Sequence, residues 1–166
     1  DVERFQPGRS QRRTFARGQT EVETKLGPLE PTEEKVALYN RHKFGRKLSA
    51  GETAIDVDGY RAFLGESCCD TFEIRYWHEG TLVGVAITDR SADALSAVYC
   101  YFDPELPRLS LGTFSILTQV ELAKRWGLRY VYLGLYIRQC RPMAYKARFN
   151  PHERRGAEGW VEFDSG

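Results

Sequence analysis

The stretch ALSAVYCYFDPELPRLSLGTFSILTQVELAKRWGLRYVYLGLY, residues 94–136, decides the fold of this chain of 166 residues. Its first part, residues 94–102, is apolar and β-rich and stops at an Asp-Pro pair, which predicts a strand. Residues 110–126 follow with the 3.6-residue period of an amphipathic helix. Residues 129–136 are β-rich and apolar, as in a buried strand. We therefore expect a strand, a long helix and a second strand in succession.

Upstream of this stretch, the pattern predicts one strand and two helices. Residues 20–26 alternate between apolar and polar side chains, which is typical of a strand. Thr32 is suited to cap a helix whose first turn is acidic, and Asp56 is suited to cap a second, shorter helix. The segment 46–55 between the two helices is polar and is expected to be a loop.

Three further strands and a short helix complete the expected elements. Residues 71–78 and 81–90 read as two strands joined by a tight turn, with a glycine where a positive φ is needed. A short helix is expected over residues 142–149, where a proline begins it. Residues 159–163 supply a last strand. The first 18 residues are basic and are expected to form an arm, the end of a missing preceding segment, ahead of one domain over residues 19–166.

The expected order is β-α-α-β-β-β-α-β-α-β. This order resembles that of the GNAT acetyltransferase fold, in which a mixed sheet opens between its fourth and fifth strands. The fold class expected is therefore α/β, in the sense of an α+β mixed sheet of the GNAT-like acyltransferase type.

Composition excludes several classes of protein. Hydrophobic residues make up 42% and charged residues 28%, as in a globular domain, and no run approaches the ~20 apolar residues of a membrane span. The net charge of +1 conceals basic ends at residues 1–17 and 138–155, which suit an anionic partner or simply form a solvated face. The four cysteines and three histidines lack metal-ligand spacing, so we expect no metal site and free thiols in a reducing cytosol.

Two segments carry candidate chemistry. The start of the helix at residue 110 presents unpaired N–H groups to an anion, helped by Gly112 and by the charge of Arg108. An acetyltransferase holds the coenzyme A pyrophosphate at such a turn, but the arginine-to-glycine spacing here differs, and an ordinary turn is the alternative. The short helix would bring Tyr145, a candidate general acid, to the open edge of the sheet. Asp103 at the end of a strand is the best-placed proton acceptor.

Linked motifs in order resemble one family. SAVYCYFDP (residues 96–104), SLGTFS (110–115), YLGLYIRQC (132–140) and MAYKARFNPHE (143–153) are similar to the C-terminal domain of aminoacyl-tRNA–protein transferases. This family comprises the arginyl-transferases of eukaryotes and the bacterial aspartate/glutamate leucyltransferases. The family's N-terminal cysteine cluster, which holds metal or an iron–sulfur cluster, is absent from this chain, so no cofactor is expected here.

Other departures from the family are smaller. Its tyrosine-arginine-histidine pattern survives only as Tyr39, Arg41 and His42 with altered spacing. Phe102 and Phe114 stand where the family often has tyrosine.

The resemblance implies a cytoplasmic enzyme of the N-degron pathway, which leads to protein degradation. It would move an amino acid, with leucine favoured and arginine the alternative, from charged tRNA to proteins beginning with Asp or Glu. We expect Asp103 to accept a proton and Tyr145 to orient the ester, with Lys146 and Arg148 binding the acidic acceptor. The residues expected to meet the aminoacyl-tRNA are Arg9, Arg12, Arg13, Arg108, Ser110, Gly112 and Thr113.

Two other functions remain open from the sequence. An acetyltransferase that uses acetyl-CoA is compatible with the element order. An RNA-binding module without catalysis is supported by the basic ends alone.

Overall fold

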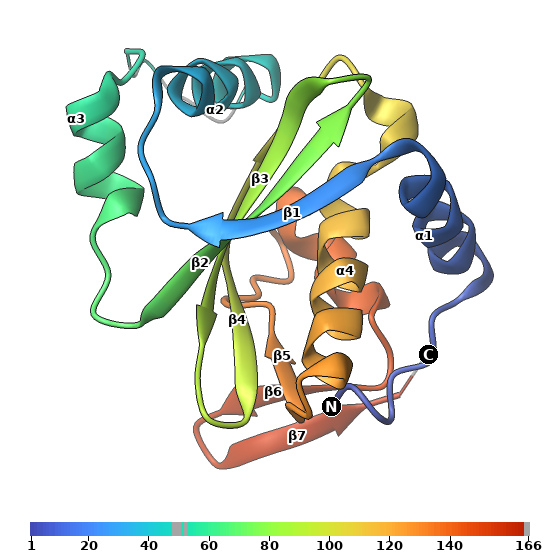
Figure 1. The fold of residues 1–166 in the computed structure, drawn as a ribbon. Coiled ribbons are helices and arrows are strands. Elements are labelled where there is room, and N and C mark those ends of the chain that lie inside the picture. The colour runs from blue at the N-terminus through green and yellow to red at the C-terminus, as the bar shows by residue number, and fades with distance from the viewer. Residues whose placement is uncertain (48–50, 52, 165–166) are drawn as a thin grey trace.

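A computed structural model describes residues 1–47, 51 and 53–164 of the chain (Figure 1). Part of the loop expected over residues 46–55 therefore lies outside the described residues. The helical elements are α1 (Arg9–Glu21), α2 (Glu33–Gly45), α3 (Val57–Tyr60), η1 (Arg61–Gly65), η2 (Pro107–Leu109), α4 (Leu111–Arg125) and η3 (Arg141–Arg148). The strands are β1 (Glu23–Pro28), β2 (Asp70–His78), β3 (Thr81–Arg90), β4 (Ala94–Phe102), β5 (Tyr130–Tyr132), β6 (His152–Gly156) and β7 (Gly159–Phe163).

Five strands form one mixed sheet in the order β1-β2-β3-β4-β5. The first four pair antiparallel and β5 joins β4 in parallel, so the expected mixed sheet is confirmed. The strands expected over residues 71–78, 81–90 and 94–102 match β2, β3 and β4 to within one residue. Glu79 and Gly80 both have positive φ, 50° and 77°, which suits the twist of the two-residue turn between β2 and β3.

The sheet opens between β4 and β5. The two strands pair only where Ala94–Ser96 meets Tyr130–Tyr132. Within the described residues, the rest of β4 has no strand partner on that side, and its register to β3 shifts beside Val98, which is 48% exposed. The strand expected over residues 129–136 is shorter, because Gly134 adopts φ 73° and turns the chain away from the sheet.

Helices cover both faces of this sheet (Figure 1). On one face, α2 and α3 bury a cluster in which the hydroxyls of Tyr60 and Tyr101 are 2.7 Å apart. Thr32 and Asp56 cap these two helices as expected, each accepting a backbone N–H within its first turn. On the other face, α4 buries ten of its fifteen residues, and seven of these are apolar side chains in a larger cluster with β2, β3 and β4. The central strand β3 is therefore buried on both faces, whereas β1 at the edge of the sheet is exposed.

The basic N-terminal segment differs from the arm that was expected. Residues 9–21 form helix α1, which packs against α4 through the buried Gly18 (Figure 1). An added Cβ on Gly18 would lie 2.2 Å from the ring of Phe114, so a glycine is needed for this close approach. The boundary expected after residue 18 falls inside α1, and β1 begins only after this helix has ended.

The C-terminal segment is built from short elements. The helix expected over residues 142–149 is the 3₁₀ run η3. The last expected strand is β7, and it pairs antiparallel with β6, a strand that the sequence did not predict. No helix of the described residues is long and apolar enough to cross a membrane.

Candidate functional site

The candidate site surrounds Phe102, the last residue of β4, where the open edge of the sheet ends. The Phe102 ring meets the ring of His42 edge-on at 4.6 Å, and the guanidinium of Arg46 lies 5.3 Å from its centre. From the other face, Gly112 comes so close that an added Cβ would lie 3.3 Å from this ring. The end of α2 and the start of α4 therefore converge on one residue of β4.

His42 fixes the end of β4 through backbone contacts. Its Nδ1 lies 3.1 Å from the Phe102 nitrogen and 2.9 Å from the Phe102 carbonyl oxygen. The side chain is 4% exposed, and burial lowers the pKa of His42 below its ordinary value. A neutral imidazole therefore holds the strand end beside the opening.

Asp103 directly follows this strand end. Its Oδ2 lies 3.5 Å from Nε of Arg41, and its Oδ1 accepts the N–H of Glu105 at 2.9 Å. The Asp103 side chain is 16% exposed, so one carboxylate is held at the rim of the opening beside a cation. Asp103 thus directly follows the end of β4 that does not pair with β5, and Arg41 lies beside its carboxyl group.

Tyr145 comes to the same region from η3. Burial raises the pKa of Tyr145, the buried thiol of Cys100 raises it further, and the charge of Arg46 lowers it. Burial also raises the pKa of Cys100 itself, to about 11. The site therefore combines the phenol of Tyr145, which can donate a hydrogen bond, with the carboxyl group of Asp103 and the guanidinium groups of Arg41 and Arg46.

Sequence reasoning did not single out Arg46 or Cys100 for this site. Arg46 caps the C-terminal end of α2, two residues after Phe44. The available signal was the basic character around the end of the expected helix, where cations meet the negative end of the helix dipole. Cys100 was expected to be a free thiol within a strand, and its position beside the opening could not be expected because it depends on how far β5 extends.

The start of α4 is arranged differently from an arginine-and-glycine anion loop. Ser110 has φ 50°, and its carbonyl accepts the N–H groups of Thr113 at 2.9 Å and Phe114 at 3.0 Å. Arg108 forms an ion pair with Glu21 of α1, and its Nη2 lies 3.3 Å from Nε2 of His78. The charge of Arg108 is therefore compensated within the protein.

The two expected acceptor-binding cations are separated. Lys146 donates to the Leu135 carbonyl at 2.8 Å, and burial lowers its pKa. Its side chain lines a cavity of about 630 Å³ between the segment that follows β5 and the β6–β7 hairpin. Arg148 is exposed and is not among the residues that line this cavity, while its carbonyl accepts from Gln11 of α1 at 3.2 Å.

The expected tRNA-contacting arginines lie on α1. Arg9, Arg12 and Arg13 are exposed in the first turns of this helix, and Arg12 donates to the Pro7 carbonyl. Because α1 packs on α4, these charges have a fixed place beside the domain. In the described part of the chain, no group of three His, Cys, Asp or Glu side chains is arranged to hold a metal ion.

Residues 34–156 match the family described as the C terminus of arginine-tRNA-protein transferase. The chain belongs to this family. It is 39% identical over 164 residues to a protein of Gluconacetobacter diazotrophicus named aspartate/glutamate leucyltransferase, with 98% of the chain and 63% of that protein covered. It is 40% identical over 161 residues to a protein of the same name from Chromohalobacter salexigens, with 96% and 65% covered. The chain thus spans less than two thirds of these relatives.

Solved structures support the fold. The chain superposes with a TM-score of 0.67 and 13% identity on the C-terminal domain of a putative lysylphosphatidylglycerol synthetase from Agrobacterium fabrum, covering 98% of the chain and 56% of that structure. The ribosomal-protein-S18-alanine N-acetyltransferase of Escherichia coli gives a TM-score of 0.55 at 13% identity, with 87% and 96% covered. The expected GNAT-like fold is confirmed.

Proposed function

We propose that this chain is the transfer domain of an aminoacyl-tRNA–protein transferase. It moves an amino acid, leucine rather than arginine, from charged tRNA to the α-amine of a polypeptide that begins with Asp or Glu. The observation that carries the proposal is the opening between β4 and β5, with Asp103 at its rim and Tyr145 brought to it from η3. The names of the curated relatives support leucine as the donated residue. A cytoplasmic location and a place in the N-degron pathway stay predictions.

The reaction is aminolysis of an ester. The acceptor nitrogen attacks the ester carbonyl carbon, a C–N bond forms, and the C–O bond to the ribose oxygen of the tRNA breaks. One proton leaves the amine and one proton reaches the departing oxygen. An α-amine has an ordinary pKa of about 7.7–8.0, so a carboxylate or a water chain is a sufficient base. Holding both reactants in one opening supplies much of the rate, on the order of 7–11 kcal/mol in well-oriented systems.

The residues at the opening fit these needs. Asp103 receives the proton of the attacking amine, directly or through water, and Arg41 keeps the carboxylate in place. The Tyr145 phenol is protonated at neutral pH, since the pKa of a tyrosine is about 10 and burial raises it further, so its hydroxyl donates to the ester or to the departing oxygen. No covalent intermediate on the protein is needed.

The cations of η3 and the start of α4 complete the proposal. Arg148 binds the acidic side chain of the acceptor, while Lys146 lies apart from it in the cavity. The basic face of α1 and the start of α4 meet the tRNA. The positions assigned to tRNA are Arg9, Arg12, Arg13, Ser110, Gly112 and Thr113, whereas Arg108, which was also expected there, is paired with Glu21.

An acetyltransferase that uses acetyl-CoA is the second candidate, because the fold alone allows it. The ion pair between Arg108 and Glu21 argues against this candidate. An arginine that is already paired with a carboxylate adds little attraction for a pyrophosphate at the start of α4.

The deciding experiment compares leucyl-tRNA, arginyl-tRNA and acetyl-CoA as donors to peptides that begin with Asp, Glu or Ala. We expect transfer from leucyl-tRNA to the acidic peptides only. Tyr145→Phe should lower the rate about 10²-fold with an unchanged free energy of unfolding. Arg148→Ala should raise KM for the Asp and Glu peptides, whereas the exposed Arg125→Ala serves as the control. Acetylation of the peptides, or full transfer by both active-site variants, would contradict the proposal.

A further inference from the structure

A run of aromatic rings extends from β5 to the β6–β7 hairpin. Tyr130 and Tyr132 stack with ring centres 6.1 Å apart and 27° between their planes. Tyr132 in turn lies 5.9 Å from Trp160, at 37°. Two strands that belong to different sheets therefore present one continuous row of rings.

These rings border the cavity of about 630 Å³ and remain open to solvent. Tyr132 is 41% exposed and Trp160 is 52% exposed, although both are large apolar groups. The inner wall is apolar and is formed by side chains from α4, the N-terminal segment and the end of η3: Phe5, Ile116, Val120 and Phe149. Exposed rings at the mouth of an apolar cavity are typical of a ligand site.

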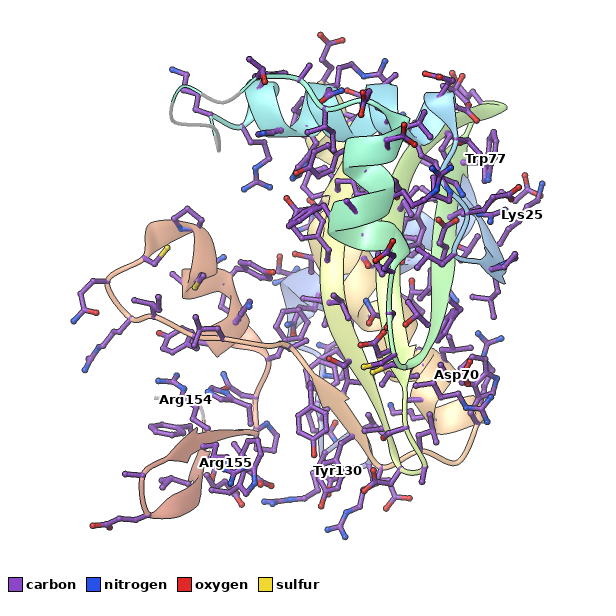
Figure 2. The ribbon with its side chains drawn as sticks, turned by 90° about the vertical axis from the view of Figure 1, so that its left-hand side faces the viewer. Lys25, Asp70, Trp77, Tyr130, Arg154 and Arg155 are labelled. Carbon is purple, nitrogen blue, oxygen red and sulfur yellow. The ribbon has the colours of Figure 1, made fainter. Side chains whose placement is uncertain are left out.

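The border of the cavity also carries cations. Arg154 lies over two rings, 4.1 Å from the centre of Tyr136 and 4.2 Å from that of Phe163, and Arg155 follows it on β6. In the part of the chain that the structure describes, no ion pair reaches Lys146, Arg154 or Arg155. Figure 2 shows Arg154 and Arg155 on the hairpin, on the side of the molecule away from Trp77 and Lys25.

The acidic groups of this border do not cancel these charges. Asp1 is engaged by Arg129, whose Nε lies 3.3 Å from its carboxylate. Glu153 is the other acidic side chain that lines the cavity. Three cations therefore stand beside flat, exposed rings, a combination that binds an anionic chain bearing planar groups.

We propose that the rings of Tyr132 and Trp160 form a stacking platform for the unpaired bases at the 3′ end of the donor tRNA. Arg155 and Arg154 contact the phosphates that join these bases. The identity of the RNA rests on the proposed function. Stacking suits this ligand because unpaired bases expose their faces, and every base has such a face.

The platform leads toward the opening between β4 and β5. Lys146 lines the cavity, and its neighbour in the chain, Tyr145, lies near Cys100 and Arg46 at the open edge of β4. When the platform holds the 3′ end of the tRNA, the terminal ester therefore lies near η3, which carries Tyr145 at the candidate site.

The test uses the unmodified chain and uncharged leucine-accepting tRNA, either intact or with its unpaired 3′ nucleotides removed. Trp160→Ala should weaken binding of the intact tRNA about ten- to hundred-fold and leave binding of the shortened tRNA unchanged. Trp160→Phe keeps a ring and should restore most of the affinity. Base stacking should quench the fluorescence of the native chain, and this quenching should be lost in Trp160→Phe.

The charge contribution is tested with a matched pair of variants. Arg155→Gln should reduce the slope of log affinity against log salt concentration by about one, because one fewer counterion is released on binding. Lys25→Gln removes a cation that lies 5.7 Å from Trp77 on the far side of the molecule, and it should leave binding unchanged.

Two outcomes separate this inference from the proposed function. If the chain transfers leucine and Trp160→Ala binds intact tRNA like the native protein, the platform is overturned while the function stands. If Trp160→Ala loses affinity for intact tRNA alone and no amino acid is transferred, the platform is supported while the function fails. An equal loss for intact and shortened tRNA would also overturn the platform.

Discussion

The central sheet with α4 and the segment after β5 are stabilised in different ways. In the sheet, even a charged side chain such as Glu73 is fully buried and is paired on two sides. After β5, the strands have five residues each, and rings such as Trp160 are more than half exposed. The sheet fixes its shape with internal contacts, whereas the C-terminal segment leaves apolar and charged groups facing outward. The difference indicates that the sheet serves as a scaffold and the C-terminal segment as a contact surface.

The largest expected effect tests the charge inside the scaffold. Both Nζ of Lys35 and Nε of Arg75 lie 2.6 Å from a carboxylate oxygen of Glu73, and Lys35 is itself 4% exposed. Glu73→Gln leaves the ammonium of Lys35 buried without its counter-charge. We expect a loss of about 3–5 kcal/mol in the free energy of unfolding, measured by urea denaturation.

The matched variant lies in the C-terminal segment. Glu162 on β7 forms a two-pronged pair with Arg4, with one contact at 2.7 Å, but both side chains are largely exposed. Glu162→Gln should leave the unfolding midpoint unchanged, since water and salt screen such a pair. Equal effects of the two substitutions would remove the distinction between the regions.

The scaffold could be predicted from sequence because its signals are local. The alternation in β2, the apolar run in β3 and the helical period of α4 each arise from burial on one or two faces of the same element. Helix α1 escaped prediction because it buries little, and its contact with α4 depends on Gly18, which reads in a sequence as a helix breaker. Strand β6 escaped because its alternating residues are mostly charged.

A second prediction, of intermediate size, tests whether α1 belongs to the scaffold. The ring of Phe114 that meets Gly18 is 2% exposed and is held between Phe15 and Tyr76, with ring centres 5.9 Å and 5.7 Å away. The ring cannot move aside, so Gly18→Ala should destabilise the protein by about 1–3 kcal/mol.

The control for this variant is Gly156→Ala in the hairpin. An added Cβ there would meet its nearest neighbour, the Gly159 carbonyl oxygen, at 4.0 Å, which is ordinary contact. Gly156→Ala should change the free energy of unfolding, measured by thermal denaturation, by no more than about 0.5 kcal/mol. If Gly18→Ala were as mild, α1 would be loosely attached rather than part of the scaffold.

The candidate site could be predicted only in part, for a physical reason. Asp103 marks the end of a strand, so its place at the edge of the sheet follows from the sequence pattern. The separation of Lys146 from Arg148 does not, because it depends on the turn at Gly134 and on the shortness of β5. The pairing of Arg108 with Glu21 likewise depends on α1, a helix in a segment that was expected to be an arm.

The smallest expected effect concerns the imidazole at the end of β4. Because burial lowers the pKa of His42 below its unfolded value of about 6.5, the unfolded chain takes up this proton more readily than the folded protein. The contribution of the neutral His42 to the free energy of unfolding is therefore complete above about pH 7.5. It is lost as the pH falls through 6.5 toward the pKa of His42 in the folded protein. We expect the native chain to lose stability through this group as the pH falls from 7.5 to 5.5.

His42→Asn should remove that part of the pH dependence, measured as urea midpoints at pH 7.5, 6.5 and 5.5. Burial also lowers the pKa of His152, but this side chain lies on the more exposed β6, so His152→Asn should flatten the curve less. The two histidine variants thus compare how strongly burial in the sheet and burial in the C-terminal segment lower the pKa of a histidine. A steeper loss of stability at low pH in His42→Asn than in the native chain would show that the imidazole is charged at the strand end, and the assignment of His42 as a neutral clamp would then be wrong.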